Sequence, residues 1–393
     1  MLRFLLVVVF LLPSLASAAP NSAFTSASGA TPGSNGAALT PRYKGITADS
    51  LRSAISIIDP ATDTVTGPFL ANVGQELLDV AITPDENTAL VSAFLSQKLL
   101  FVDISDIDHP KLKDSIDFRA VPTTTPSFHP EDIAITPDGR FAVVSDGAMA
   151  SCGYSIAQGI ATINLTTRTL KQYLTLSKPK VVQSVSVDKY GNVYGGDYCN
   201  QKLYVLTLGS DGTVADTASE FALDIRPLNS YVSPDSRQLF VTGFKGVEVY
   251  QIEGPGKITA SAKNLTLGNI QSMAFSADGT KGYLADIAST PDRIIVLDTR
   301  TLQPLRTISL LSNCAGGYYG TDVTAITPDG KKLYVGNLAA AGSCDTSTKL
   351  FVMDLDDYHT GAIDLGPDSA PAATAFRGLF RFDFYVPLAP KGF

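Results

Sequence analysis

The chain has 393 residues, of which 45% are hydrophobic and only 17% charged, with 32 Gly, 23 Pro and no Trp. Long amphipathic helices need many charged residues, so this composition favours strands and turns. The formal net charge of -8 and the lack of any Lys/Arg cluster exclude a nucleic-acid partner, because such binders present a basic surface.

The N-terminal segment predicts export. Met1–Arg3 is weakly basic, Leu5–Leu12 is apolar, and Ala16–Ala18 supplies the small residues before a signal-peptidase cut. We therefore interpret residues 1–18 as a signal peptide and the protein as secreted or extracytoplasmic, with an uncleaved anchor as the alternative. Later stretches are too short to span a bilayer, so no membrane insertion is expected.

Two kinds of sequence follow the signal peptide. Residues 19–50 are rich in Ala, Ser, Gly and Thr and predict a flexible extension. From residue 51 onward, one pattern recurs: an apolar strand, a Pro-Asp or Asp-Gly turn and a second apolar strand, six times at a spacing of 43 to 53 residues. This is the signature of a hairpin repeat. The turns carry Asp85, Asp138, Tyr190-Gly191, Asp235, Asp278 and Asp329.

A second hairpin follows each of these six, as in KLYVLTLGSDGTV from Lys202. One more second hairpin starts at Ser53, and a segment from Ala372 offers the missing first hairpin. The sequence therefore predicts an all-β, seven-bladed β-propeller over residues 51–393, closed by strands from both termini, which removes exposed sheet edges.

The repeats resemble a known family. KKLYVGN (Lys331–Asn337) followed by KLFVMDLDD is similar to YVTN-type repeats of the lactonase-like propellers, and FVDISDIDHPKL (Phe101–Leu112) resembles related secreted repeats. The resemblance spans roughly residues 53 to 390 and implies the propeller fold, a scaffold that hosts many unrelated activities.

Polar residues stand where each innermost strand begins, at the expected mouth of the central channel. Because calcium prefers several oxygen ligands, these side chains are candidate ligands, and they loosely resemble the acid-and-amide calcium ring of the lactonases. The alternative is that they hydrogen-bond the backbone between blades. The candidates are Asp79, Glu131, Asp132, Asn229 and Asp322.

His129 precedes two of these acids and is the candidate general base, since imidazole titrates near neutrality; a surface histidine is the alternative. A second set of polar residues follows the second strands and predicts turn capping. This set is Asp146, Asp197, Asp286 and Asn337.

An even number of cysteines in an exported chain predicts disulfides. The expected loop positions favour Cys152–Cys199 and Cys314–Cys344, both at the mouth. Tyrosines in these long loops are candidate ligand contacts or loop packing: Tyr154, Tyr198, Tyr318 and Tyr319. The sequons at Asn164 and Asn264 predict glycosylation.

Three functions stay open at the level of sequence. The first is an extracellular binding or scaffold protein that uses the disulfide-linked face for a protein, glycan or small molecule; missing nucleophile motifs favour it. The alternative is a metal-dependent lactonase- or esterase-like hydrolase, with calcium at the channel mouth activating water. The third is an accessory propeller in a redox complex, whose cofactor would have to come from a partner because no haem motif or Trp is present.

Overall fold

The chain divides into two units, Met1–Arg42 and Tyr43–Phe393. The computed structural model describes residues 43–50, 52–121, 128–147, 159–177, 181–286, 292–310, 321–337, 349–365 and 371–376, without the side chains of 218, 263–264, 321–323, 337 and 371–376. Everything below concerns these residues of the second unit.

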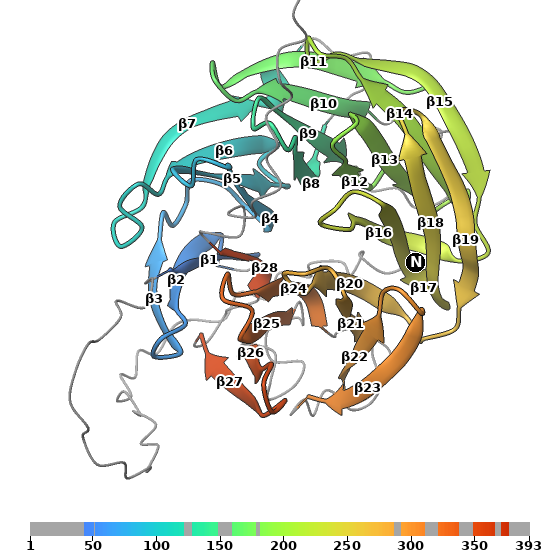
Figure 1. Ribbon diagram of the computed structural model, residues 1–393. Helices are drawn as coiled ribbons and strands as arrows, with labels where there is room; N and C mark the ends of the chain where they lie inside the picture. Colours follow the sequence, from blue (N-terminus) through green and yellow to red (C-terminus); the bar gives the residue numbers. More distant parts are fainter. Residues whose placement is uncertain are drawn as a thin grey trace, which may run out of the picture. The chain divides into compact units, whose positions relative to one another are not determined.

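The described residues form seven four-stranded antiparallel sheets, set radially around one axis (Figure 1). The prediction of an all-β, seven-bladed propeller is confirmed. Blade 1 comprises β28 (Pro371–Phe376), β1 (Gly45–Asp49), β2 (Ala54–Asp59) and β3 (Thr64–Phe69). Blade 2 comprises β4 (Leu77–Ile82), β5 (Thr88–Ala93), β6 (Lys98–Asp103) and β7 (Lys111–Asp117), followed by the short 3-10 helix η1 (Phe118–Ala120).

The other five blades repeat this plan with strands in chain order from the axis outward. Blade 3 is β8 (Pro130–Ile135), β9 (Phe141–Asp146), β10 (Gly159–Asn164) and β11 (Thr169–Thr175). Blade 4 is β12 (Ser184–Val187), β13 (Asn192–Asp197), β14 (Lys202–Leu208) and β15 (Val214–Ala222). Blade 5 is β16 (Arg226–Val232), β17 (Gln238–Phe244), β18 (Gly246–Gly254) and β19 (Lys257–Leu265). Blade 6 is β20 (Ile270–Phe275), β21 (Lys281–Asp286), β22 (Arg293–Asp298) and β23 (Gln303–Ser309). Blade 7 is β24 (Thr321–Ile326), β25 (Lys332–Asn337), β26 (Lys349–Asp354) and β27 (Thr360–Asp364).

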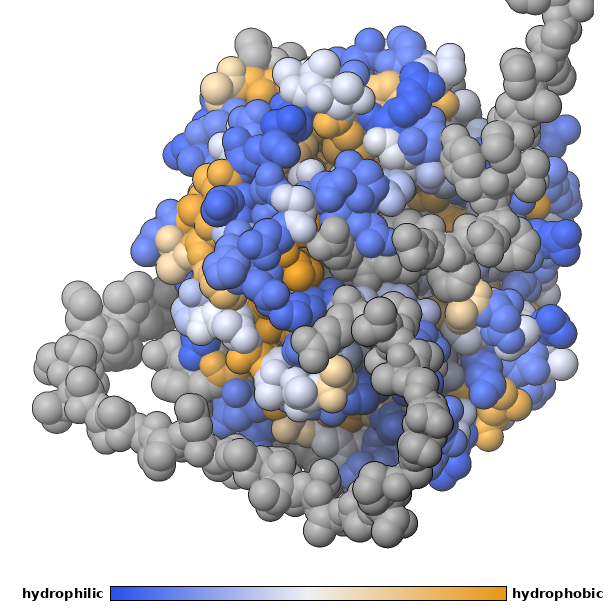
Figure 2. All heavy atoms as spheres, turned by 60° about the vertical axis from the view of Figure 1, so that its left-hand side comes forward, coloured by the Kyte–Doolittle hydropathy of each residue, from blue (hydrophilic) through white to orange (hydrophobic). Residues whose placement is uncertain are grey.

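The hydrophobic core lies between blades. Each middle strand is apolar on both faces because a neighbouring blade covers each side. One cluster, for example, joins Leu90 and Phe101 of blade 2 to Val144 and Ile163 of blade 3. Outer strands such as β7 are largely exposed, and the surface around blades 1 to 3 is mostly hydrophilic with hydrophobic residues interspersed (Figure 2). Within the described ranges there is no helix long and apolar enough to span a membrane.

The turn between first and second strands has a common chemistry. In blade 3, the Thr136 hydroxyl donates to Asp138 Oδ1 at 2.6 Å, and the same oxygen accepts from the Arg140 backbone at 3.0 Å. Gly139 closes the turn with φ 67°, a conformation that favours glycine. Blade 4 lacks the turn aspartate, and Asp188, at the position of Thr136, accepts from two turn N–H groups instead.

Blade 1 differs from expectation in its strand sources. The chain was expected to contribute two strands from each end, with the propeller starting at residue 51. Instead, β1 already begins at Gly45, and β28 pairs with β1, so three strands come from the N-terminal side (Figure 1). The strand GITAD was not recognised because it is short and lies beside a Gly/Ser-rich stretch; in the structure it is entirely buried.

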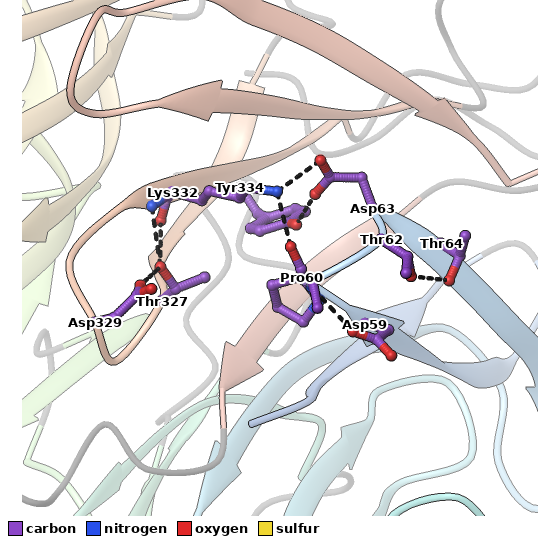
Figure 3. A network of polar contacts seen from close by, with 10 residues as sticks. Asp59, Pro60, Thr62, Asp63, Thr64, Thr327, Asp329, Lys332 and Tyr334 are labelled. Atoms are coloured by element: carbon purple, nitrogen blue, oxygen red, sulfur yellow. Dashed lines mark hydrogen bonds and ion pairs between the residues drawn. The ribbon is translucent and has the colours of Figure 1, made fainter. Parts of the chain in front are cut away.

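A polar latch joins blade 7 to blade 1 on the side of the first-strand turns (Figure 3). Lys332 Nζ donates to the Pro60 carbonyl and to Asp63 Oδ2, each at 2.7 Å, across 272 and 269 residues of sequence. The buried Tyr334 hydroxyl donates to the other Asp63 oxygen. Burial, followed by this hydrogen bond to Asp63, raises the pKa of Tyr334.

Candidate functional site

The mouth face is the end of the propeller at which the chain enters each innermost strand. Because the strands are antiparallel, the loops joining second to third strands lie at this same end. Asp79, Glu131, Asp132 and Asn229 stand near the start of innermost strands β4, β8 and β16. The structure therefore places the described calcium candidates on the predicted face.

Asp79 and Asp132 each connect their blade to the next one. Asp79 Oδ2 accepts from the Ile133 backbone N–H of blade 3 at 2.8 Å. Asp132 Oδ2 accepts in the same way from Val185 of blade 4 at 2.8 Å. The second oxygen of each carboxylate accepts from the N–H of the residue that follows it. These bonds are the inter-blade alternative that the sequence analysis left open.

Hydroxyl groups of the second strands complete these inter-blade contacts. Ser92 Oγ accepts from the Asp79 backbone and donates to the Glu131 carbonyl of blade 3 at 2.8 Å. Ser145 Oγ of blade 3 accepts from the Asp132 backbone and donates to the Gln183 carbonyl, which leads into blade 4, at 2.6 Å. Sequence reasoning missed both serines, although a hydroxyl recurs at this position of otherwise apolar strands.

Blades 5 and 6 are joined by an amide instead of a carboxylate. Asn229 Nδ2 donates to the Gln271 carbonyl at 2.8 Å. At the corresponding positions of blades 4 and 6, the short side chains of Ser184 and Ser272 are buried and make no hydrogen bond to described residues. At this position of the innermost strand, the described side chains that reach the next blade are thus the longer Asp and Asn.

Asp79 and Asp132 lie close enough to affect each other's ionisation. Burial, followed by the negative charge of Asp132, raises the pKa of Asp79 well above its ordinary value, and the two carboxyl groups hydrogen-bond each other. Two adjacent carboxylates repel unless a proton lies between them. The pair therefore holds a proton at a pH at which an exposed aspartate is ionised.

These hydrogen bonds leave few carboxylate oxygens available to coordinate a metal ion. Among the described residues, no group of three or more His, Cys, Asp or Glu side chains is arranged to hold one. Calcium needs six to eight oxygen ligands, whereas Asp79 and Asp132 already accept backbone N–H groups. The described side chains thus do not fit a calcium site. The calcium hypothesis also includes Asp322, whose side chain is outside the described part, and it stays a prediction.

Glu131 and His129 occupy the approach to β8. The Glu131 carboxyl lies against Gly147, where a Cβ would come 2.1 Å from Glu131 Oε2. His129 stacks at 5.0 Å from the Phe94 ring, and its Nε2 lies 3.3 Å from Gln97 Nε2. An amide nitrogen only donates, so His129 Nε2 accepts and its proton is on Nδ1.

The surroundings of His129 favour a neutral ring. Burial lowers the pKa of His129, and the buried Nδ1 makes no hydrogen bond to a described residue. A general base normally has a third group that orients it, and the described residues supply none to Nδ1. The catalytic role of His129 stays a prediction.

The second set of acids fastens loops, but only Asp197 caps the turn that follows its strand as predicted, and the side chain of Asn337 lies outside the described part. Asp146 Oδ1 accepts from the His129 backbone N–H, and Asp286 Oδ1 accepts from the Asn269 backbone N–H. His129 and Asn269 lie in segments that lead into innermost strands. Asp197 accepts from the Asn200 backbone at 2.9 Å in the following turn and from Val181 at 3.1 Å. The acids thus hold the mouth loops to the ends of the second strands.

Several predicted surface features are only partly described. Cys199 is disulfide-bonded, but its partner and the other cysteines, Cys152, Cys314 and Cys344, lie outside the described residues, as do Tyr154, Tyr318 and Tyr319. The Tyr198 ring packs 5.0 Å from the Arg226 guanidinium and 6.0 Å from the Phe244 ring.

The two sequons also differ in what is described. Asn164 caps its own turn by accepting from the Thr167 backbone at 3.1 Å. The side chain of Asn264 is not described. Neither observation tests glycosylation.

A recess of about 500 Å³ opens on the mouth face between blades 1 and 2. Its walls are the β1–β2 turn, the segment between β3 and β4, the β5–β6 turn with the start of β6, and η1. The described lining residues supply cations, hydroxyls and amides, and no carboxylate is among them. The lining residues are Arg52, Ser53, Asn72, Val73, Gly74, Gln75, Leu95, Ser96, Lys98 and Arg119.

At the level of sequence, the chain matches no protein-family model and no curated protein. Solved structures share its fold. A protein of unknown function from Desulfotomaculum acetoxidans is 18% identical with a TM-score of 0.67, over 85% of this chain and 98% of that one. The periplasmic gluconolactonase of Pseudomonas aeruginosa is 16% identical with a TM-score of 0.63, over 86% and 99%. Hydrazine synthase of Kuenenia stuttgartiensis is 13% identical with a TM-score of 0.55, over 81% and 95%. The chain is thus a seven-bladed β-propeller structurally similar, at low identity, to lactonase-like propellers and to propellers of unknown function.

Proposed function

We propose that this chain is a secreted binding protein whose mouth face carries its binding site. One observation supports the proposal most: the channel-side polar groups are engaged in joining blades, whereas a polar recess opens beside them. Concave sites with a few convergent polar groups are the usual form of small-ligand sites.

The second candidate is a metal-dependent lactonase- or esterase-like hydrolase in the YVTN/lactonase-like family. The fold likeness to a periplasmic gluconolactonase favours it, as does the half-buried Asp79–Asp132 pair at the channel. This hypothesis needs a calcium ion at the channel mouth whose ligands include Asp322 in addition to the described side chains, and the ion would supply Lewis-acid chemistry there.

One experiment separates the two functions. Purified protein is screened for small-molecule binding by thermal shift, and for hydrolysis of sugar lactones with and without added calcium. Saturable binding without turnover supports the binding protein. Calcium-dependent turnover that is lost in Asp132→Ala overturns it in favour of the hydrolase.

We further propose that export follows cleavage after Ala18, that Cys152–Cys199 and Cys314–Cys344 are the disulfides, and that the ring is closed by strands from both ends of the chain. The pairing of β28 with β1 supports closure. Deleting residues 371–393 would then unpair β1 and expose a sheet edge. A truncated protein as stable as the full chain would refute closure by the C-terminal strand.

A further inference from the structure

We propose that the recess between blades 1 and 2 binds a small hydroxylated carboxylate of the sugar-acid class. This inference rests on the proposed binding function and names its ligand chemistry. The recess volume of about 500 Å³ is within the range for small-ligand sites and far larger than a single inorganic anion needs. Nothing in the channel contacts described above involves its lining residues.

The first argument is an excess of cations over carboxylates. Lys98 is the first residue of the third strand of its blade, a position held by Lys202 in blade 4, Arg293 in blade 6 and Lys349 in blade 7. Lys202 pairs with its own acid, Glu220, at 2.6 Å, and Arg293 pairs with Asp286 at 2.7 Å.

In blade 2, the Arg119 guanidinium donates two hydrogen bonds to the neighbouring Asp117 carboxylate. Lys98 lies opposite Asp117 in the strand register, and its charge helps to lower the pKa of that carboxyl group, so Lys98 and Arg119 share one carboxylate beside the recess that both line. In a protein with a net charge of -8 the recess therefore has more cations than carboxylates, and an anionic ligand would supply a second acceptor for Lys98.

The second argument is a prebuilt rim. The Gln75 backbone donates to Ser96 Oγ at 3.0 Å, and the Leu95 backbone to the Gln75 carbonyl at 3.2 Å. The Glu76 backbone donates to Ser53 Oγ at 3.2 Å. These bonds tie the three loops together before any ligand arrives, which reduces the entropy lost on binding.

The same segment carries unusual backbone conformations. Leu70, Asn72 and Glu76 have φ of 54°, 70° and 53°, three non-glycine residues in a region that favours glycine. Such strain gathers at ligand sites, where the surrounding contacts maintain it. The Asn72 and Gln75 amides supply donors and acceptors for hydroxyl groups, and the half-exposed Leu95 offers an apolar contact. The described lining residues include no aromatic side chain, so charge rather than ring stacking would select the ligand.

The test is isothermal titration of the full chain with a panel of hexuronic and hexonic acids, their neutral sugars and inorganic phosphate, at low ionic strength. We expect a sugar acid to bind with a Kd on the order of 0.1–1 mM, more weakly as salt rises, and its neutral sugar not to bind. Lys98→Gln should raise the Kd about tenfold, as expected for one lost charge-assisted contact.

Two further variants sharpen this test. Lys113→Gln changes the net charge equally but sits on β7 beside Asp103, so it should leave the Kd unchanged. Asn72→Gly keeps the positive φ and removes the amide, so it should weaken sugar-acid binding.

Any of four results would overturn the inference. The neutral sugar or phosphate could bind as tightly as the sugar acid, no acid could bind at all, or Lys98→Gln could leave the Kd unchanged. A different ligand bound at the mouth face independently of Lys98 would overturn it while leaving the binding function standing. Calcium-dependent lactone turnover would instead overturn the binding function itself.

Discussion

The latch between blades 7 and 1 gives a sharp prediction about stability. Asp63 accepts at once from Lys332 and from the buried Tyr334 hydroxyl. Asp63→Asn keeps the size of the side chain and tolerates the positive φ of 50° at this position. An amide has one accepting oxygen and one donating nitrogen, so only one of the two donors keeps its acceptor.

The expected cost follows from which donor can reach water. The Lys332 side chain is 24% exposed and Asp63 is 37% exposed, so the ion pair itself contributes little, within about 1 kcal/mol. Tyr334 is buried, and a weakened or lost partner for a buried hydroxyl costs about 1–3 kcal/mol. We therefore expect Asp63→Asn to lower the free energy of unfolding by about 1.5–2.5 kcal/mol.

Urea unfolding followed by circular dichroism measures this change. Asp211→Asn, an exposed turn aspartate of blade 4, is the matched control and should have no measurable effect. In a Tyr334→Phe background, Asp63→Asn should cost at least about 1 kcal/mol less, because contacting residues couple. The latch would not stabilise the fold if the costs of Asp63→Asn and Tyr334→Phe were additive, or if Asp63→Asn cost no more than Asp211→Asn.

Three further predictions concern the mouth. Because burial and the negative charge of Asp132 raise the pKa of Asp79, the folded protein binds a proton there at a higher pH than the unfolded chain does, and this group's contribution to stability falls as pH rises through the raised pKa. The stability of Asp79→Asn relative to wild type should therefore increase over that same rise in pH when urea unfolding is measured at a series of pH values, and a difference that does not change with pH would contradict the shared proton. Asp132→Asn should lower the free energy of unfolding, measured in urea, by about 1–3 kcal/mol, because backbone N–H groups and the Asp79 carboxyl converge on Asp132. A cost no greater than that of Asp79→Asn would argue against this role. Gly147→Ala should cost about 1–3 kcal/mol by forcing Glu131 aside, and an unchanged unfolding midpoint would show that Glu131 moves freely.

The repeat made the fold predictable, because hairpin turns such as Thr136–Gly139 depend only on local sequence. The contributions of the two termini to blade 1 were harder to predict, since GITAD at Gly45–Asp49 becomes a strand only through its buried long-range partners. Periodicity placed Asp79 and Asp132 on the mouth face. It did not reveal that both reach the next blade, because that depends on the distance between neighbouring strands.

The recess was not predictable from sequence. Arg52, Lys98 and Arg119 come from three separate segments that carry no shared motif and meet only when blades 1 and 2 pack together. Only the structure shows that Lys98 and Arg119 share the Asp117 carboxylate.

If the inner-strand acids join blades and binding takes place beside them, the mouth holds no resident calcium. This is measured as the calcium content of the purified, signal-free protein after dialysis against metal-free buffer. We expect no stoichiometric ion, and no change in content when Asp132 is replaced by Ala. One tightly held calcium per chain, lost in Asp132→Ala, would contradict this expectation and establish the metal centre that a hydrolase requires.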